Sequence, residues 1–185
     1  MGEPGMITWL LKRGAHAHLA TDTGELPLHL AARHGHVQAC QQLVDAYPAA
    51  LHTYSRYSKQ APLHEAAAQG WPEAVEYLLT TGAKVTQRDV TNKTPLQLAI
   101  WAETTAQNAK YNKQFPARQQ ATIQALLHSE PGVGDRSKLG HALADAADAN
   151  SLNAFQCVVD LGADVTWRAN KETPTALHYG AFVAP

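Results

Sequence analysis

Cysteine is scarce in this chain of 185 residues, which contains only Cys40 and Cys157. Two cysteines cannot build a disulfide framework, so we expect a reducing, intracellular location, in the cytoplasm or the nucleus. Long apolar runs are also missing, since none approaches the roughly 18 residues of a membrane span. The first residues lack the basic and apolar segments of a secretory signal. No association with a membrane is therefore expected.

The chain also lacks an excess of positive charge. Fifteen Lys and Arg residues stand against sixteen Asp and Glu residues, which gives a formal net charge of -1. A nucleic-acid-binding domain normally carries a basic excess or a basic stripe, so no nucleic-acid partner is expected. Hydrophobic residues make up 45% of the sequence, a share typical of a folded domain rather than a disordered one.

A short pattern recurs around three prolines. It reads Leu-Pro-Leu-His-Leu-Ala-Ala at Pro27, Ala-Pro-Leu-His-Glu-Ala-Ala at Pro62 and Thr-Pro-Leu-Gln-Leu-Ala-Ile at Pro95. The spacings are 62 − 27 = 35 and 95 − 62 = 33 residues. Each proline predicts the start of a helix, because the first helical residue needs no N–H group. A repeat of this length indicates stacked units that share one core.

A second pattern, Gly-Ala, follows an apolar stretch at Gly14, Gly82 and Gly162, where a left-handed glycine would end a helix. The Thr-Pro-Leu-His-x-Ala pattern, the Gly-Ala pattern and the period near 33 together resemble the ankyrin-repeat family. The resemblance covers nearly the whole chain. It implies an all-α solenoid of helix-turn-helix units joined by short β-hairpin loops.

A single ankyrin-repeat domain is predicted over residues 1–185, with four full units and a half-unit at each end. The approximate units are 1–20, 21–55, 56–88, 89–135, 136–168 and 169–185. The third unit carries an inserted segment, 104–118, because Pro95 to Leu126 takes 31 residues where Pro62 to Leu78 takes 16. Two interpretations of this insertion stay open: a surface loop without a role, or a functional element.

No catalytic motif is evident, so neither enzymatic activity nor a cofactor is expected. His141, Asp145 and Asp148 share one face of a predicted helix and could together hold a metal ion. A solvated helix face is favoured over a metal site, because genuine sites are rare. Three further histidines occupy the position at which the family forms hydrogen bonds between units: His29, His64 and His178.

The resemblance implies a non-enzymatic protein–protein interaction module with a concave binding surface. A protein or peptide is the expected partner, and a monomer is the expected state in solution. The alternative is an accessory or targeting domain of a larger enzyme or effector whose catalytic part lies outside this chain. Extending the open reading frame in both directions would separate the two.

The family binds its partners through hairpin tips and the exposed sides of the first helices. The corresponding positions of this sequence are Asp22, Glu25, Arg33, His34, Tyr57, Gln60, Gln69, Lys93 and Trp101. Tyr57 belongs to a cluster with Tyr54 and Arg56, residue types that often anchor interfaces. For Trp101 two interpretations stay open: an exposed hot spot, or a ring packed under the insertion and covered by Tyr111 or Phe115.

Overall fold

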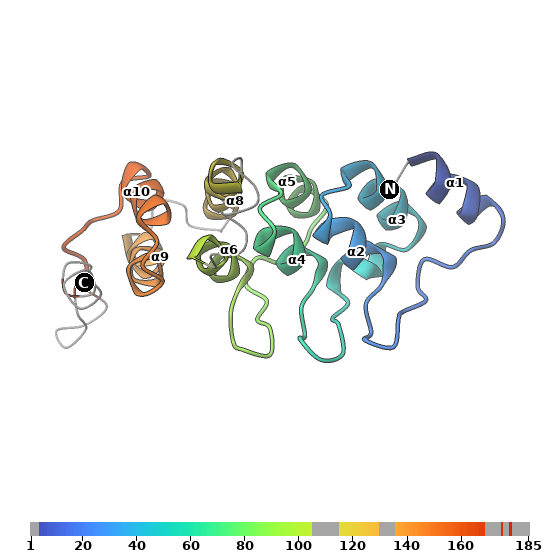
Figure 1. Ribbon diagram of the computed structural model, residues 1–185, viewed down its shortest axis with the longest axis horizontal. Coiled ribbons are helices and arrows are strands. Elements are labelled where there is room, and N and C mark those ends of the chain that lie inside the picture. The colour runs from blue at the N-terminus through green and yellow to red at the C-terminus, as the bar shows by residue number, and fades with distance from the viewer. Residues whose placement is uncertain (1–3, 105–114, 130–135, 169–174, 176–177, 179–185) are drawn as a thin grey trace.

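Pairs of helices stacked side by side form the structure, a computed structural model that describes residues 4–104, 115–129, 136–168, 175 and 178. Figure 1 shows two rows of helices running along the long axis. The inner row contains the first helix of each pair: α2 (Pro27–Arg33), α4 (Pro62–Ala68), α6 (Pro95–Thr104) and α9 (Arg136–Asp148). The outer row contains α1 (Pro4–Lys12), α3 (Val37–Ala46), α5 (Pro72–Thr80), α8 (Phe115–Ser129) and α10 (Leu152–Asp160). The all-α solenoid prediction is confirmed, and no β-strand occurs among the described residues.

Prolines begin three of the inner helices, as predicted, and the side chain three residues into the pattern completes the helix start. The N–H of Leu26 donates to Nδ1 of His29 at 3.1 Å, and His64 makes the same contact one unit later. In α6 a full capping box forms: Thr94 Oγ1 accepts the N–H of Gln97, and Oε1 of Gln97 accepts the N–H of Thr94. The third residue after the start of the pattern thus caps the helix in all three units, as His in α2 and α4 and as Gln in α6.

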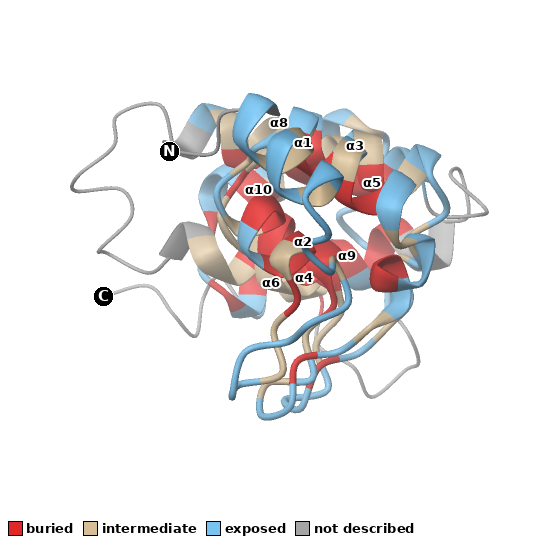
Figure 2. Ribbon diagram, turned by 90° about the vertical axis from the view of Figure 1, so that its right-hand side faces the viewer, coloured by how far each residue is buried: buried red, intermediate tan, exposed pale blue. Residues whose placement is uncertain are grey.

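The hydrophobic core lies between the two rows and is continuous from unit to unit. Figure 2 shows buried stretches where helices face one another, and exposed residues on the outer surfaces and loops. Large, fully buried side chains come from both rows: Leu28, Leu63, Ile100 and Leu143 from the inner helices, and Leu78, Leu126 and Val158 from the outer helices. Burying one such side chain contributes roughly 1.5–3 kcal/mol. Cys40 and Cys157 are both buried in this core.

The third helix pair is longer than the pairs before it. Helix α6 has 10 residues where α2 and α4 have 7, and α8 has 15 where α5 has 9. Part of the inserted segment 104–118 thus extends the two helices it joins, while residues 105–114 lie outside the described part of the chain. The division of 1–185 into individual units stays a prediction.

Three loops project from the array on the side of the inner helices, and we call them fingers: finger 1 (15–26), finger 2 (53–61) and finger 3 (83–94). Each predicted hairpin is closed across its base by one backbone hydrogen bond, from Thr21 to Glu25, from Ser55 to Gln60 and from Asp89 to Lys93, and fingers 1 and 3 add one bond within the tip, from Gly24 to Thr21 and from Asn92 to Asp89. One bond across the base makes a tight turn and leaves too little pairing for a strand. Figure 1 shows the fingers side by side, pointing the same way.

Finger 2 is one residue longer at its tip than its neighbours. Its closing bond spans 60 − 55 = 5 residues, whereas that of finger 3 spans 93 − 89 = 4. The other extra residue of the 35-residue period lies ahead of the finger, where the 3-10 helix η1 (Pro48–His52) follows α3. In each finger, the residue before the one whose carbonyl accepts the closing bond has a left-handed backbone conformation: Gly24 (φ 77°), Lys59 (φ 50°) and Asn92 (φ 64°). Finger 2 therefore holds a lysine in a conformation that favours glycine.

Candidate protein-binding surface

Backbone hydrogen bonds join each finger to the next. The N–H of Arg56 in finger 2 donates to the carbonyl of Thr23 in finger 1 at 2.8 Å. The N–H of Val90 in finger 3 donates to the carbonyl of Ser58 in finger 2 at 2.9 Å. The three fingers thus form one connected surface, which a partner can contact without first ordering separate loops.

A buried carboxylate holds finger 3 in shape. Asp89 accepts the N–H groups of Thr91 and Lys93 through Oδ1, at 2.8 and 3.0 Å, and the side-chain amide of Gln60 through Oδ2 at 3.3 Å. Burial works to raise the pKa of Asp89, but these hydrogen bonds outweigh it, so the pKa lies below its usual range. Gln60, a predicted contact residue, is therefore partly occupied within the chain. The Asp-x-Thr spacing is the local signal for this turn, and it recurs at Asp164.

The tips of fingers 2 and 3 expose large apolar side chains. Tyr57 is 69% exposed, Tyr54 44% and Val90 60%. Tyr57 stands on the longer tip of finger 2, and Val90 is the residue whose N–H joins finger 3 to it. A cluster of this kind on neighbouring loops is a common feature of interaction sites.

Two predicted contact residues, Glu25 and Arg33, are engaged with each other and with a third residue. Arg33 donates from Nε and Nη2 to the two carboxylate oxygens of Glu65, both at 2.9 Å, and also pairs with Glu25. The hydrogen bond from Arg33 lowers the pKa of Glu25 although burial opposes it. A partner that contacts Arg33 or Glu25 must compete with this network. The sequence signal was an acid, Glu65, at a position where α2 has Leu30.

Lys93 and Trp101 also contact each other. The ammonium of Lys93 lies 4.0 Å from the ring centroid of Trp101, a cation–π pair, and the ring is partly buried against the core. The residues expected to cover the ring fall outside the description: Tyr111 entirely, and Phe115 in its side chain. Whether Trp101 acts as a hot spot or as a covered ring stays a prediction.

The remaining predicted contact residues are spread over two levels of the array. Asp22 is exposed at the tip of finger 1. His34 is exposed at the end of α2, where its ring stacks on His36 with centroids 6.0 Å apart. Gln69 is partly buried at the end of α4, and its carbonyl accepts a hydrogen bond from Arg118 at 3.4 Å. Of the predicted set, Asp22 and Tyr57 are exposed on fingers and His34 is exposed at the end of an inner helix.

A clamp at the turns between inner and outer helices was missed by the sequence prediction. Trp71 packs its ring where a side chain on Gly35 would stand, and its Nε1–H donates to the carbonyl of Arg33 at 2.9 Å. The guanidinium of Arg118 lies 3.8 Å from the centroid of that ring. Next to it, the buried amide of Gln119 donates to carbonyls of α4 and α6 at 3.0 and 2.6 Å. These side chains hold neighbouring units together.

Two side chains of the possible metal site, Asp145 and His141, are directed to different partners. Asp145 accepts two hydrogen bonds from the amide of Gln97, at 3.1 and 3.3 Å, and burial raises its pKa. The ring of His141 packs on Trp167 with centroids 4.7 Å apart. Over the described residues, no group of three potential ligands converges on one point.

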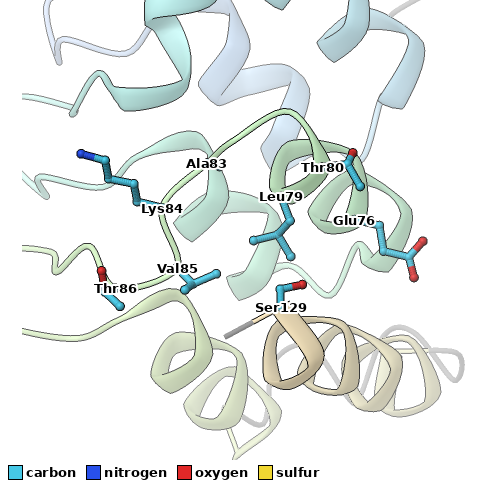
Figure 3. Close-up of a pocket in the computed structure, with 8 residues that line it drawn as sticks. All are labelled: Glu76, Leu79, Thr80, Ala83, Lys84, Val85, Thr86 and Ser129. Atoms are coloured by element: carbon cyan, nitrogen blue, oxygen red, sulfur yellow. The ribbon is translucent and has the colours of Figure 1, made fainter. Parts of the chain in front are cut away.

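A shallow hollow of about 560 Å³ lies between the ends of α5 and α8. Figure 3 shows its lining, which mixes Leu79 and Val85 with Glu76, Lys84 and the hydroxyl of Ser129. In this lining, the hydroxyl of Ser129 donates to the carbonyl of Ala125 at 2.7 Å. Within the described residues, none of the helices has the length and apolar character needed to cross a bilayer.

Known proteins share this architecture. Residues 2–89 match the family model for ankyrin repeats in three copies. The crystal structure of the human ASB11 ankyrin repeat domain superimposes with a TM-score of 0.69 over 96% of this chain and 72% of that chain, at 21% sequence identity. Residues 2–89 are thus ankyrin repeats, and the chain has the fold of an ankyrin-repeat domain. Ankyrin repeats are protein-interaction modules.

Curated relatives match about half of the chain. Mouse NF-kappa-B inhibitor alpha is 34% identical over 94 residues, which are 49% of this chain and 30% of that protein. Human ankyrin repeat and SOCS box protein 3 is 32% identical over 96 residues, 51% of this chain and 18% of that protein. The Hydra vulgaris tyrosine-protein kinase HTK16 is 29% identical over 102 residues, 55% of this chain and 14% of that protein. The matched segments are thus small parts of longer proteins.

Proposed function

We propose that this chain is a non-enzymatic interaction module that binds a protein or peptide on a concave surface made by its fingers and inner helices. The observation that carries the proposal is the connected row of fingers with Tyr54, Tyr57 and Val90 exposed at adjacent tips. Aromatic side chains in such positions supply a large contact area at a low cost in conformational entropy. Connected loops also reduce the ordering cost of binding.

A protein partner suits this surface better than a nucleic acid. The formal net charge is -1, and finger 1 carries two carboxylates, Asp22 and Glu25. A phosphate backbone that followed the row of fingers would meet these acids, and binding to phosphates relies on an uninterrupted basic track.

A second possibility is an accessory domain within a larger enzyme or effector. The match to a segment of the Hydra tyrosine-protein kinase favours it, since that protein joins a similar segment to a kinase. This possibility keeps the same binding surface and adds chemistry outside the chain. Sequencing the transcript on both sides of the 185 residues separates it from a free-standing adaptor.

Selection from a displayed library of random peptides tests the proposed surface. Peptides that the immobilised chain enriches should lose at least tenfold in affinity for the Tyr57→Ala variant, because an aromatic anchor is removed. Gln41→Ala on the outer helix α3 is the matched control and should bind them at full strength. Failure to enrich any peptide, or peptides that ignore Tyr57→Ala and Val90→Ala, would contradict the proposal.

A further inference from the structure

Charge is distributed unevenly along the three fingers. Finger 1 (15–26) contains two carboxylates and no Lys or Arg. Finger 2 (53–61) contains Arg56 and Lys59 and no acid. Finger 3 (83–94) contains three cations, Lys84, Arg88 and Lys93, and one acid, Asp89. The sign of the charge therefore changes between the first finger and the other two.

The one acid of finger 3 is already satisfied within the chain. Asp89 is 8% exposed and accepts hydrogen bonds from Thr91, Lys93 and Gln60. Its carboxylate therefore does little to neutralise the cations that face solvent around it. Fingers 2 and 3 are more basic at their surface than the residue count suggests.

Four cations of these fingers are exposed and form no ion pair among the described residues: Lys84, which lines the hollow beside α5, and Arg56, Lys59 and Arg88. The ion pairs that the structure describes are those of Arg33. Arg88 is held at its finger, since its Nη1 donates to the carbonyl of Asn92 at 2.7 Å. The exposed Tyr57 and Val90 lie on the same two fingers. Apolar anchors and uncompensated cations thus occur together on one part of the array.

We propose that fingers 2 and 3 bind an extended, acidic peptide segment of a partner protein, with its apolar side chains on Tyr57 and Val90 and its carboxylates on Arg56, Lys59 and Arg88. This inference rests on the proposed function and adds the chemistry of the partner. Opposite charge on a partner segment complements the three cations, whereas a basic segment would be repelled. The acids of finger 1 set the limit of the site on one side.

The spacing of the fingers sets the length of the segment. Packed helices stand roughly 8–10 Å apart, and an extended chain advances about 3.3 Å per residue. One step from finger to finger therefore takes about three residues of an extended peptide. A segment of about six residues would therefore cover both fingers, and an octapeptide adds about one residue at each end.

Binding of defined peptides by the whole chain tests the inference. The probe is the capped octapeptide Glu-Glu-Glu-Leu-Phe-Glu-Glu-Glu, and the comparison peptide carries Gln in place of every Glu. We expect the acidic peptide to bind at least tenfold more tightly than the Gln peptide, and its affinity to weaken as the salt concentration rises. Equal affinity for the two peptides would overturn the inference.

Charge-reversal variants locate the site. The double variant Arg56→Glu with Lys59→Glu should weaken binding of the acidic peptide at least tenfold. Lys12→Glu, an exposed residue on α1 away from fingers 2 and 3, makes the same kind of charge change and should stay within twofold. Circular dichroism melts of each variant verify that the array remains folded. A loss with Lys12→Glu as large as with the double variant would overturn the inference.

Two further outcomes separate this inference from the proposed function. If the displayed library yields neutral or basic peptides that still need Tyr57, the binding surface stands and the acidic specificity is wrong. If a ten-nucleotide thymidine oligomer binds more tightly than the acidic octapeptide and depends on Arg56 and Lys59, the cations serve a phosphate backbone, and both proposals fall. A library that yields no peptide at all removes both as well.

Discussion

The first two helix pairs and the last two stack in the same way but are joined by different side chains. In the regular region, α2 to α5, the Nε2 of His29 reaches the carbonyl of Gln60, and Arg33 pairs with Glu65. In the irregular region, α6 to α10, the equivalent of His29 is Gln97, whose amide donates to Asp145. At His29 and at Gln97, this inner-helix position makes a contact with the next unit.

His64 shows that the repeat residue alone does not guarantee the contact. Its Nδ1 accepts the N–H of Ala61, yet its buried Nε2 makes no second hydrogen bond. In the last segment, Nδ1 of His178 lies 2.6 Å from the hydroxyl of Thr175. The contact to the start of its own helix is common to these side chains, and the contact between units depends on what the next unit presents.

Removing core volume should have the largest effect on stability. Leu63 is completely buried, so Leu63→Ala should destabilise the array by about 2–5 kcal/mol. Leu79 lines the open hollow and is only partly buried, so Leu79→Ala should cost clearly less. Urea unfolding followed by circular dichroism measures both. Equal losses would show that the hollow is closed in solution.

The Arg33–Glu65 ion pair of the regular region should contribute more to stability than the Gln97–Asp145 hydrogen bonds of the irregular region. Glu65→Gln removes one of the two carboxylates that pair with Arg33 and leaves only that of Glu25, at a cost of about 1–3 kcal/mol, which stays below that of a fully buried pair because water still reaches Arg33. Asp145→Asn should cost less, since an amide oxygen can still accept from Gln97. The free energies of unfolding of the two variants test this ranking. A larger loss of stability for Asp145→Asn than for Glu65→Gln would contradict it.

Acid should weaken the regular region through its buried imidazoles. Burial lowers the pKa values of His29 and His64 below 6.5, so the unfolded chain binds protons that the folded chain does not. The stability from each group is present above pH 6.5 and is lost as the pH falls through the folded pKa.

Gln97, which occupies the repeat position of His64, suggests a variant that removes part of the pH dependence of stability. Gln97 makes the same capping contact without a titratable group, so His64→Gln should lose less stability than the parent between about pH 7.5 and 5.5. The difference should reach about 1 kcal/mol. Urea unfolding at both pH values gives the comparison, and an unchanged pH dependence would show that His64 is not a source of the acid sensitivity.

The smallest expected effect concerns the tip of finger 2 and has opposite signs for folding and binding. Lys59 is left-handed at a position where finger 1 has glycine, so Lys59→Gly should raise the stability by up to about 1 kcal/mol. The same change removes a cation and should lower the affinity for the acidic octapeptide. Melting curves and peptide titrations measure the two effects. A loss of stability would show that the lysine side chain makes contacts in solution that offset the backbone strain.

Local sequence features predicted the framework of this protein. Proline at the first helical position and glycine at the end of a helix act within a few residues of the chain. For this reason the starts of α2, α4 and α6 and the left-handed Gly14, Gly82 and Gly162 agree with the prediction.

The sequence by itself thus determined the all-α repeat and the row of loops, whereas the tertiary structure decided which side chains those loops leave free. Glu65 meets Arg33 across 32 residues of sequence, and Gln60 meets Asp89 across 29. Such partners come from neighbouring units, whose distance in space is unrelated to their separation along the chain. Stacking occupied Arg33, Glu25 and Gln60 and left Tyr57 exposed, because only the assembled array brings one finger against the next.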